Sequence, residues 1–136
     1  MNQIVVGVDR SACATAALTF AVEEARLRQA RLQVVFVVGY QLVGDLPIGP
    51  DLDGQLVAAG KAVLDDALAS VDTTGVTVEP RLERGVASER LLDLARDASL
   101  LVVGSRGRGG FAGLLLGSTS QACAHHTPCP LVIVPG

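Results

Sequence analysis

The chain has 136 residues and a formal net charge of −3; 49% of its residues are hydrophobic and 18% are charged. A chain of this length forms one domain, here residues 1–136, and buries about two thirds of its unfolded surface. The composition excludes a disordered or fibrous protein. The negative charge argues against nucleic-acid binding, because contact with a phosphate backbone requires a basic surface.

The N-terminal region and the cysteines predict the cellular compartment. The first apolar run, Ile4–Val8, is only a few residues long and follows no basic segment. It is too short for a secretory signal or a membrane span. The three cysteines are an odd number in a chain large enough to fold without disulfides. We therefore expect reduced thiols, a cytoplasmic location and no insertion into a membrane.

The first half of the chain alternates between strand and helix patterns. Strands are predicted over Ile4–Val8 and Leu32–Val38, whose nearly continuous apolar residues are typical of strands covered on both faces. One helix lies between them, over about residues 11–28, and a second follows a loop that contains Pro47 and Pro50. Apolar residues recur at helical spacing in both: Ala14, Leu18, Ala21, Val22 and Ala25 in the first, and Leu56, Ala59, Val63, Ala67 and Val71 in the second.

A third strand and a third helix follow. The run Val76–Leu82 alternates between apolar and polar residues and contains Pro80. Proline cannot donate a ladder hydrogen bond, so this strand belongs at an edge of the sheet. The apolar face of the third helix consists of Ala87, Leu91, Ala95 and Ala98.

The last part of the chain predicts two strands around a fourth helix. The strands are Leu100–Val103 and Leu131–Val134. The helix opens at Ser118, where the pattern S-x-x-Q with Gln121 fits a capping box, and it ends before Pro128.

Strands that alternate with helices run parallel through right-handed crossovers, which predicts an α/β three-layer sandwich with a five-stranded parallel sheet. Ligands of such sheets bind beyond the carboxyl ends of the strands, where the strand order reverses. Asp9 follows the first strand and Gly104 ends the fourth. If these strands are neighbours, both residues face one crevice.

The stretch from Gly104 to Gly117 is rich in glycine, with six glycines in fourteen residues. Without Cβ atoms the backbone can approach a ligand closely, and successive N–H groups can converge on an anion. The helix that follows offers free N–H groups and hydroxyls at Ser118 and Thr119. The stretch is interpreted as a phosphate cradle; the alternative is a surface loop in which Ser118 is an ordinary N-cap.

The spacing of these glycines resembles a known motif. Gly104-x2-Gly107-x9-Gly117-Ser118 is similar to the nucleotide motif G-x2-G-x9-G-[S/T] of the universal stress protein family. Three further stretches resemble the same family in the same order: residues 4–9 with Ser11, residues 100–110 and residues 126–134. The resemblance covers essentially the whole chain.

The resemblance implies a Rossmann-like fold of the adenine nucleotide alpha hydrolase-like type, with strand order 3-2-1-4-5. It also implies ATP binding and a homodimer formed through Leu131–Val134. Asp9 and the Val37 backbone would lie at the adenosine end. The ribose and phosphates would be held by Gly104, Gly107, Gly117 and Ser118, followed by the backbone N–H of Thr119.

The chain departs from the family pattern at three positions. Phe36 stands where a histidine often precedes the adenine-contacting valine, and Ser99 where an aspartate often precedes the fourth strand. Thr119 replaces a usual valine. The glycine spacing is intact, so these departures bear on fine specificity more than on binding.

Several residues have a second interpretation. Asp9 could cap the first helix or bind loop amides, or help to hold Mg²⁺ through water. Arg106 and Arg108 could pair with phosphate, or they could be solvated surface arginines. Cys13, in an alanine-rich helix, is expected to be a small core residue.

A metal site in the segment Cys123–Cys129 is not expected. The segment combines thiols and imidazoles, which bind zinc, but the spacing fits no familiar ligand pattern, and Cys123, His125 and His126 do not share one helix face.

The sequence gives little support for catalysis. Lys61 is the only lysine and lies far from any glycine loop, so there is no P-loop, and no G-x-S-x-G motif is present. We expect a regulatory protein that holds ATP or hydrolyses it slowly. The alternatives are an ATP-independent dimeric interaction module, a binder of AMP or a cyclic nucleotide, and a genuine ATPase or phosphotransferase.

Overall fold

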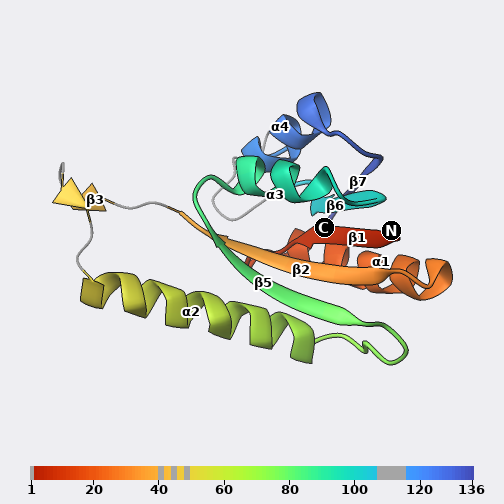
Figure 1. The fold of residues 1–136 in the computed structure, drawn as a ribbon, viewed down its shortest axis with the longest axis horizontal. Coiled ribbons are helices and arrows are strands. Elements are labelled where there is room, and N and C mark those ends of the chain that lie inside the picture. Colours follow the sequence, from red (N-terminus) through yellow and green to blue (C-terminus); the bar gives the residue numbers. More distant parts are fainter. Residues whose placement is uncertain (1, 40–41, 44–45, 48–49, 107–115) are drawn as a thin grey trace.

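The structure, a computed structural model, describes residues 2–39, 42–43, 46–47, 50–106 and 116–136. In this part of the chain a parallel sheet is covered by helices on both faces (Figure 1). The elements in chain order are β1 (Gln3–Gly7), α1 (Ala12–Arg28), β2 (Arg31–Val38), β3 (Leu42–Val43), β4 (Leu46–Pro47), α2 (Pro50–Ala69), β5 (Val78–Arg84), α3 (Ala87–Ala95), β6 (Leu100–Gly104), α4 (Ser118–His126) and β7 (Leu131–Val134).

The sheet has the order β5-β2-β1-β6-β7, and every neighbouring pair in it is parallel. This confirms the predicted order 3-2-1-4-5, since β3 and β4 form a separate small hairpin. It also confirms that the strand with Pro80 lies at an edge. In the centre, Val6 of β1 is opposite Val102 of β6, so the carboxyl ends of these two strands lie side by side.

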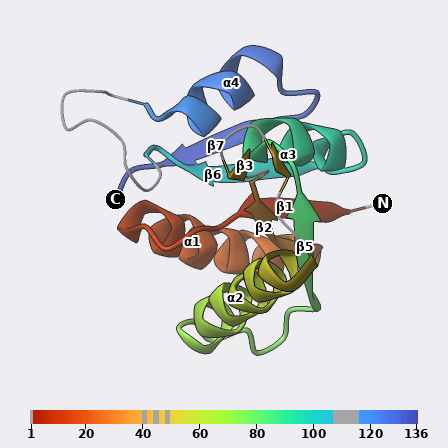
Figure 2. The same cartoon turned by 90° about the vertical axis from the view of Figure 1, so that its left-hand side faces the viewer.

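The helices form the two outer layers (Figure 2). Helices α1 and α2 pack on one face, against even-numbered strand residues such as Ile4 and Val6. Helices α3 and α4 pack on the other face, against Val5, Val35 and Leu101. Because successive strand residues point to opposite faces and both faces are covered, the strands read as continuous apolar runs.

Helix α1 is fixed at both ends by local backbone geometry. Ser11 is its N-cap, with extended backbone angles and a hydroxyl that accepts the N–H of Ala14 at 3.1 Å. The helix ends at Gln29, which takes the left-handed conformation with φ of 52° and lets its N–H reach the carbonyls of Ala25 and Arg26. These caps confirm the predicted boundaries to within one residue.

Some predicted boundaries are wrong by a few residues. Strand β5 starts and ends two residues later than the run Val76–Leu82. Helix α2 includes Pro50, which the sequence pattern placed in the preceding loop. Proline suits a first helical position, because the N–H that it lacks would have no helical partner. Helix α3 ends before Ala98, although this side chain still packs against the core. The hairpin β3–β4 was not predicted.

The predicted capping box at Ser118 is also wrong. Ser118 is the first helical residue of α4, and the N-cap is Gly117, whose extended backbone has φ of −75° and ψ of 174°. No side chain caps this end; the N–H of Gln121 donates to the carbonyl of Gly117 at 2.9 Å as the first helical bond. The helix N-terminus is therefore not covered by a serine hydroxyl of its own cap.

The substitution Leu101→Ala tests the packing of the inner strand β6. Leu101 is fully buried in β6, so Leu101→Ala should lower the free energy of unfolding by about 2–5 kcal/mol through lost burial and a cavity. The measurement is urea denaturation followed by circular dichroism. Leu27 is 77% exposed on α1, and Leu27→Ala should change stability by less than about 0.5 kcal/mol. Equal losses in the two variants would contradict this packing.

Candidate functional site

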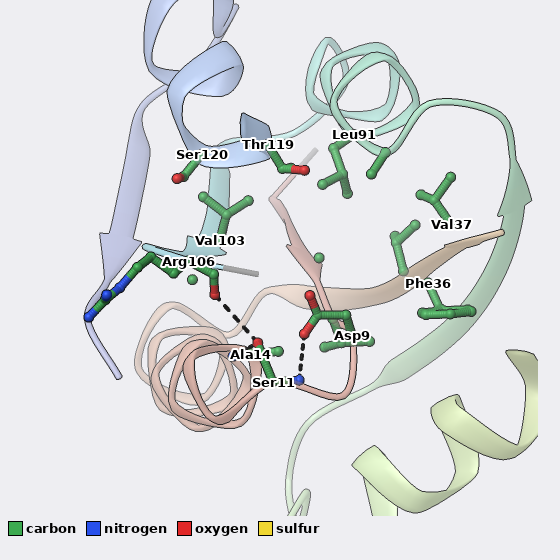
Figure 3. A pocket seen from close by; sticks show the side chains of 15 residues that line it. Asp9, Ser11, Ala14, Phe36, Val37, Leu91, Val103, Arg106, Thr119 and Ser120 are labelled. Carbon is green, nitrogen blue, oxygen red and sulfur yellow. Dashed lines mark hydrogen bonds between the residues drawn. The ribbon is translucent and has the colours of Figure 1, made fainter. Parts of the chain in front are cut away.

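A crevice lies beyond the carboxyl ends of β1, β2 and β6, where helices α1, α3 and α4 approach the sheet (Figure 3). In Figure 3, Thr119 and Leu91 lie on one side of the crevice and Asp9 and Ser11 on the other. The lining consists of Gly7, Val8, Asp9, Ser11, Ala14, Val35, Phe36, Val37, Ala87, Leu91, Val103, Gly104, Arg106, Thr119 and Ser120. The crevice occupies the place predicted for a ligand.

The structure brings most of the predicted ligand residues to this place. Asp9, Val37, Gly104 and Thr119 belong to the lining. Gly117 and Ser118 stand beside it, where the chain enters α4. Gly107 and Arg108 lie outside the described residues.

Asp9 forms the turn between β1 and α1. Its Oδ1 accepts the N–H of Ser11 at 2.7 Å. Asp9 thus binds a loop amide, as one interpretation of the sequence expected, but it does not cap α1, because Ser11 is the N-cap. The carboxylate also lines the crevice. The turn therefore holds the carboxylate in place at the side of the candidate ligand site.

Two glycines at the strand ends permit close packing of helices. A Cβ on Gly104 would lie 2.7 Å from Cβ of Cys13 and 2.9 Å from its carbonyl carbon, so α1 can approach β6 only at a glycine. A Cβ on Gly7 would lie 2.7 Å from Cδ1 of Leu91 in α3. From the sequence, the glycine at position 104 is interpreted as room for a ligand; in the structure it first makes room for α1.

The base of the glycine-rich stretch is closed by hydrogen bonds to one carbonyl group. The carbonyl oxygen of Ser105 accepts the N–H of Gly117 at 2.7 Å and the hydroxyl of Ser120 at 2.8 Å. The N–H of Ser105 donates to the carbonyl of Val134 at 2.8 Å. The N–H of Gly117 is thus used within the chain. The first N–H groups of a helix have no partner inside it, so the donors that α4 offers to an anion are those of Ser118, Thr119 and Ser120.

The described lining residues of the crevice include few charged side chains. Among the lining residues, Asp9 and Arg106 carry charged side chains, and the first turn of α4 contains no acidic residue. In Figure 3 the Arg106 guanidinium points away from Asp9. The backbone carbonyl of Arg106 accepts a hydrogen bond from the Ser11 hydroxyl at 3.5 Å. An anion near the start of α4 therefore meets a positive helix end without a competing carboxylate from that turn.

The other end of the crevice is apolar. Val37 and Leu91 lie there, and Figure 3 shows Val37 and Phe36 pointing in different directions from β2. Phe36 and Val37 are also walls of a second hollow on the α2 side, with Leu56, Ala59 and Val63. Such a surface suits a flat apolar group such as a nucleobase.

Sequence and structure comparisons identify relatives of this chain. Residues 1–135 match the family model described as the universal stress protein family. The chain belongs to the universal stress protein family. A universal stress protein of Mycolicibacterium smegmatis is 38% identical over 134 residues, which cover 96% of this chain and 45% of that protein. This chain thus spans about half the length of the curated relatives it matches.

Solved universal stress proteins share the fold. UspA from Lactobacillus plantarum has a TM-score of 0.79 and 26% identity, over 98% of this chain and 97% of that one. A universal stress protein in complex with cAMP has a TM-score of 0.74 and 29% identity, over 98% and 96% of the two chains. One from Archaeoglobus fulgidus in complex with dAMP has a TM-score of 0.74 and 25% identity, over 98% of both chains.

Other candidate sites carry less chemistry. Within the described ranges, no three His, Cys, Asp or Glu side chains lie close enough together to hold a metal ion. In the segment Cys123–Cys129, Cys123 is buried in the core while His125 and His126 are exposed. None of the helices in the described part of this universal stress protein has the length and apolar character needed to cross a membrane.

Cys13 differs from the core residue that was expected. It is half-buried, and its Sγ lies 3.7 Å from Oγ of Ser105. The hydrogen bond with Ser105 lowers the pKa of the thiol, and backbone contacts with Arg106 and Gly136 add to this effect. Burial raises the pKa of Cys123 to about 11, and burial also raises the pKa of Cys129.

These shifts predict an order of thiol reactivity. The thiolate is the reactive form, so a lowered pKa increases its fraction at neutral pH and a raised pKa decreases it. Iodoacetamide at about pH 7.5 should therefore modify Cys13 first and Cys123 last. Peptide mass spectrometry over time gives the three rates, and labelling of Cys123 ahead of Cys13 in the folded protein would contradict the arrangement.

Proposed function

We propose that this universal stress protein binds an adenine nucleotide, with ATP as the ligand, and acts as a regulatory protein through its nucleotide state. The observation that carries this proposal is one crevice bounded by the Asp9 turn, the apolar end at Val37 and the open N-terminus of α4. The Asp9 turn suits a ribose, the apolar end at Val37 suits a base, and the N-terminus of α4 suits phosphates.

In this proposal the ligand lies across the ends of the strands. The base packs at Val37 and Leu91, and the ribose lies near Asp9 and Gly104. The phosphates extend toward α4, where the N–H groups of Ser118 and Thr119 bind them, with Gly117 at the base of the loop. Gly107 is assigned to the phosphates by the resemblance, and it lies outside the described residues.

The relatives support the ligand class. One universal stress protein has been solved with cAMP and another with dAMP, and both ligands are adenine nucleotides. These complexes also favour the second candidate, in which this chain binds AMP or a cyclic nucleotide. Mass spectrometry of the ligand released from freshly purified protein separates the candidates. ATP supports the first, a monophosphate supports the second, and an empty crevice favours an ATP-independent interaction module.

The proposed role does not require turnover or a resident metal. Phosphoryl transfer needs positioned cations and a base or an oriented water, and Asp9 is the one carboxylate among the lining residues that the structure describes. Mg²⁺ would arrive with the phosphates and keep most of its water, with Asp9 as a water-mediated contact. Phosphate release abolished by Asp9→Ala would instead indicate an ATPase.

Thr119→Glu tests the phosphate end. A glutamate in the first turn of α4 should repel the phosphates and weaken ATP binding at least tenfold, about 1.4 kcal/mol or more. The same charge favours the helix dipole, so stability should be kept or raised. Calorimetry and thermal unfolding measure the two effects.

Gln121→Glu is the matched control, because Gln121 is exposed in the same part of α4 and lies outside the crevice lining. It should change ATP affinity by less than about threefold, since exposed charges are screened. Equal affinity for ATP in wild type and Thr119→Glu would reject the proposed phosphate position.

We further propose that residues 1–136 form one cytoplasmic domain and that this domain forms a homodimer through β7. The N–H groups of Leu101 and Ser105 donate to Pro130 and Val134, so the even-numbered residues of this stretch face β6. The backbone groups of Leu131 and Ile133 then point away from the sheet. An apolar edge strand with outward N–H and C=O groups is suited to pair with a second copy.

Ile133→Pro tests this edge. It removes an outward N–H and leaves the bonds from β6 to Pro130 and Val134 in place, so the dimer should dissociate while the fold persists. Light scattering at micromolar concentration should show a twofold lower mass than wild type, with circular dichroism as the check on folding. A monomeric wild-type protein would refute the dimer.

A further inference from the structure

Ser120 is a buried hydroxyl whose position is unusual for a helix residue. It is 2% exposed, and its Oγ lies 2.8 Å from the carbonyl oxygen of Ser105 and 3.1 Å from that of Gly117. A serine inside a helix often bonds back to its own helix. Here the shorter contact reaches outside α4, to the residue that follows β6.

The carbonyl of Ser105 joins the two ends of the glycine-rich stretch. It accepts the N–H of Gly117 at 2.7 Å as well as the Ser120 hydroxyl. The Ser105 N–H, on the other side of the same Cα atom, is bound to Val134 of β7, so Ser105 cannot shift without disturbing the sheet. The N-terminus of α4 is therefore held against the carboxyl end of β6 by two bonds to one fixed acceptor.

We propose that Ser120 is a positioning residue of the nucleotide site, whose hydroxyl sets the placement of the first turn of α4 relative to β6. The inference rests on the proposed function. Donors that are already in place bind a ligand without the cost of ordering them. Ser120 acts on the phosphate end only, because the adenosine end is formed by Asp9, Val37 and Leu91 from β1, β2 and α3.

A purely structural role makes a different prediction. Loss of the hydroxyl would then lower stability and weaken every ligand by the same factor, or weaken none. A positioning role weakens binding in proportion to the contacts made by phosphates. Affinities for adenosine, AMP and ATP therefore distinguish the two roles.

The experiment compares Ser120→Ala with Thr127→Ala. Thr127 lies at the other end of α4, where its hydroxyl donates to the carbonyl of Cys129 at 2.6 Å and accepts the N–H of Cys129 at 3.3 Å. The control removes a hydroxyl of the same kind beside the same helix, far from the phosphate end. Calorimetry with adenosine, AMP and ATP gives the affinities, and hydrogen exchange of the ligand-free protein reports the Gly117 amide.

In Ser120→Ala we expect ATP to bind about tenfold more weakly while adenosine stays within about twofold, the size of effect that one lost hydrogen bond produces. The Gly117 amide should exchange about tenfold faster, because its bond to Ser105 opens more often. Thr127→Ala should leave both the affinity pattern and the Gly117 exchange as in wild type.

Three results would overturn the inference: unchanged ATP affinity in Ser120→Ala, equal weakening of adenosine and ATP, or unchanged exchange of the Gly117 amide. A wild-type protein that binds none of the three ligands would overturn the proposed function itself, together with the role of Ser120 in binding. The two failures are distinguishable, because the second is seen in wild type and the first only in the variant.

Discussion

The parallel pairing of β1 with β6 is the interaction on which the candidate site depends. The ladder places Ile4 opposite Leu100 and Val6 opposite Val102, and both strands are buried on both faces. The residues that follow these strands are distant in sequence; Ser11 and Arg106, for example, are 95 positions apart. Only this pairing brings the Asp9 turn and the start of the glycine-rich stretch to the same crevice. A different strand order would separate them by the width of at least one strand.

The site shows how few backbone groups remain for a ligand once the fold has used the others. Gly104 makes room for Cys13, and Gly7 makes room for Leu91. The N–H of Gly117 is bound to Ser105. Gly104 and Gly117, which the sequence predicts as ligand contacts, thus also serve the packing of α1 on the sheet and the closure of the loop. Within the described ranges, the donors that remain at this end of the crevice lie at the start of α4, where the helix dipole already favours an anion.

Much of the fold could be predicted from the sequence, because the alternation of apolar runs and helical patterns is a local signal repeated along the chain. The edge position of β5 followed from Pro80 alone. The strand order came from the resemblance to the universal stress proteins, since local patterns do not specify which strands are neighbours. The sequence left a few possible partners for the Asp9 carboxylate, and the structure shows that it accepts a hydrogen bond from the Ser11 amide.

The parts that could not be predicted depend on contacts between distant residues. The S-x-x-Q pattern suggested that Ser118 caps α4, but a local pattern contains no information on the carbonyl of Ser105, which binds Gly117 and leaves it as the N-cap. Ser120 gave no signal, because its partner lies 15 positions earlier. The sequence predicts Cys13 as a core residue, because its partner Ser105 follows β6 and lies far away in the chain.

The same residue, Ser105, links the candidate ligand site to the proposed dimer edge. Ser105 accepts bonds from the start of α4 and donates one to Val134, the last residue of β7. Under the proposed function, phosphates bound at α4 and a second copy bound at β7 would both act on Ser105. A ligand changes an equilibrium only by its difference in affinity for the two states, so coupling requires that α4 be held differently in the monomer and the dimer. Ser105 is hydrogen-bonded to both elements and is therefore a direct physical connection through which such a difference would pass.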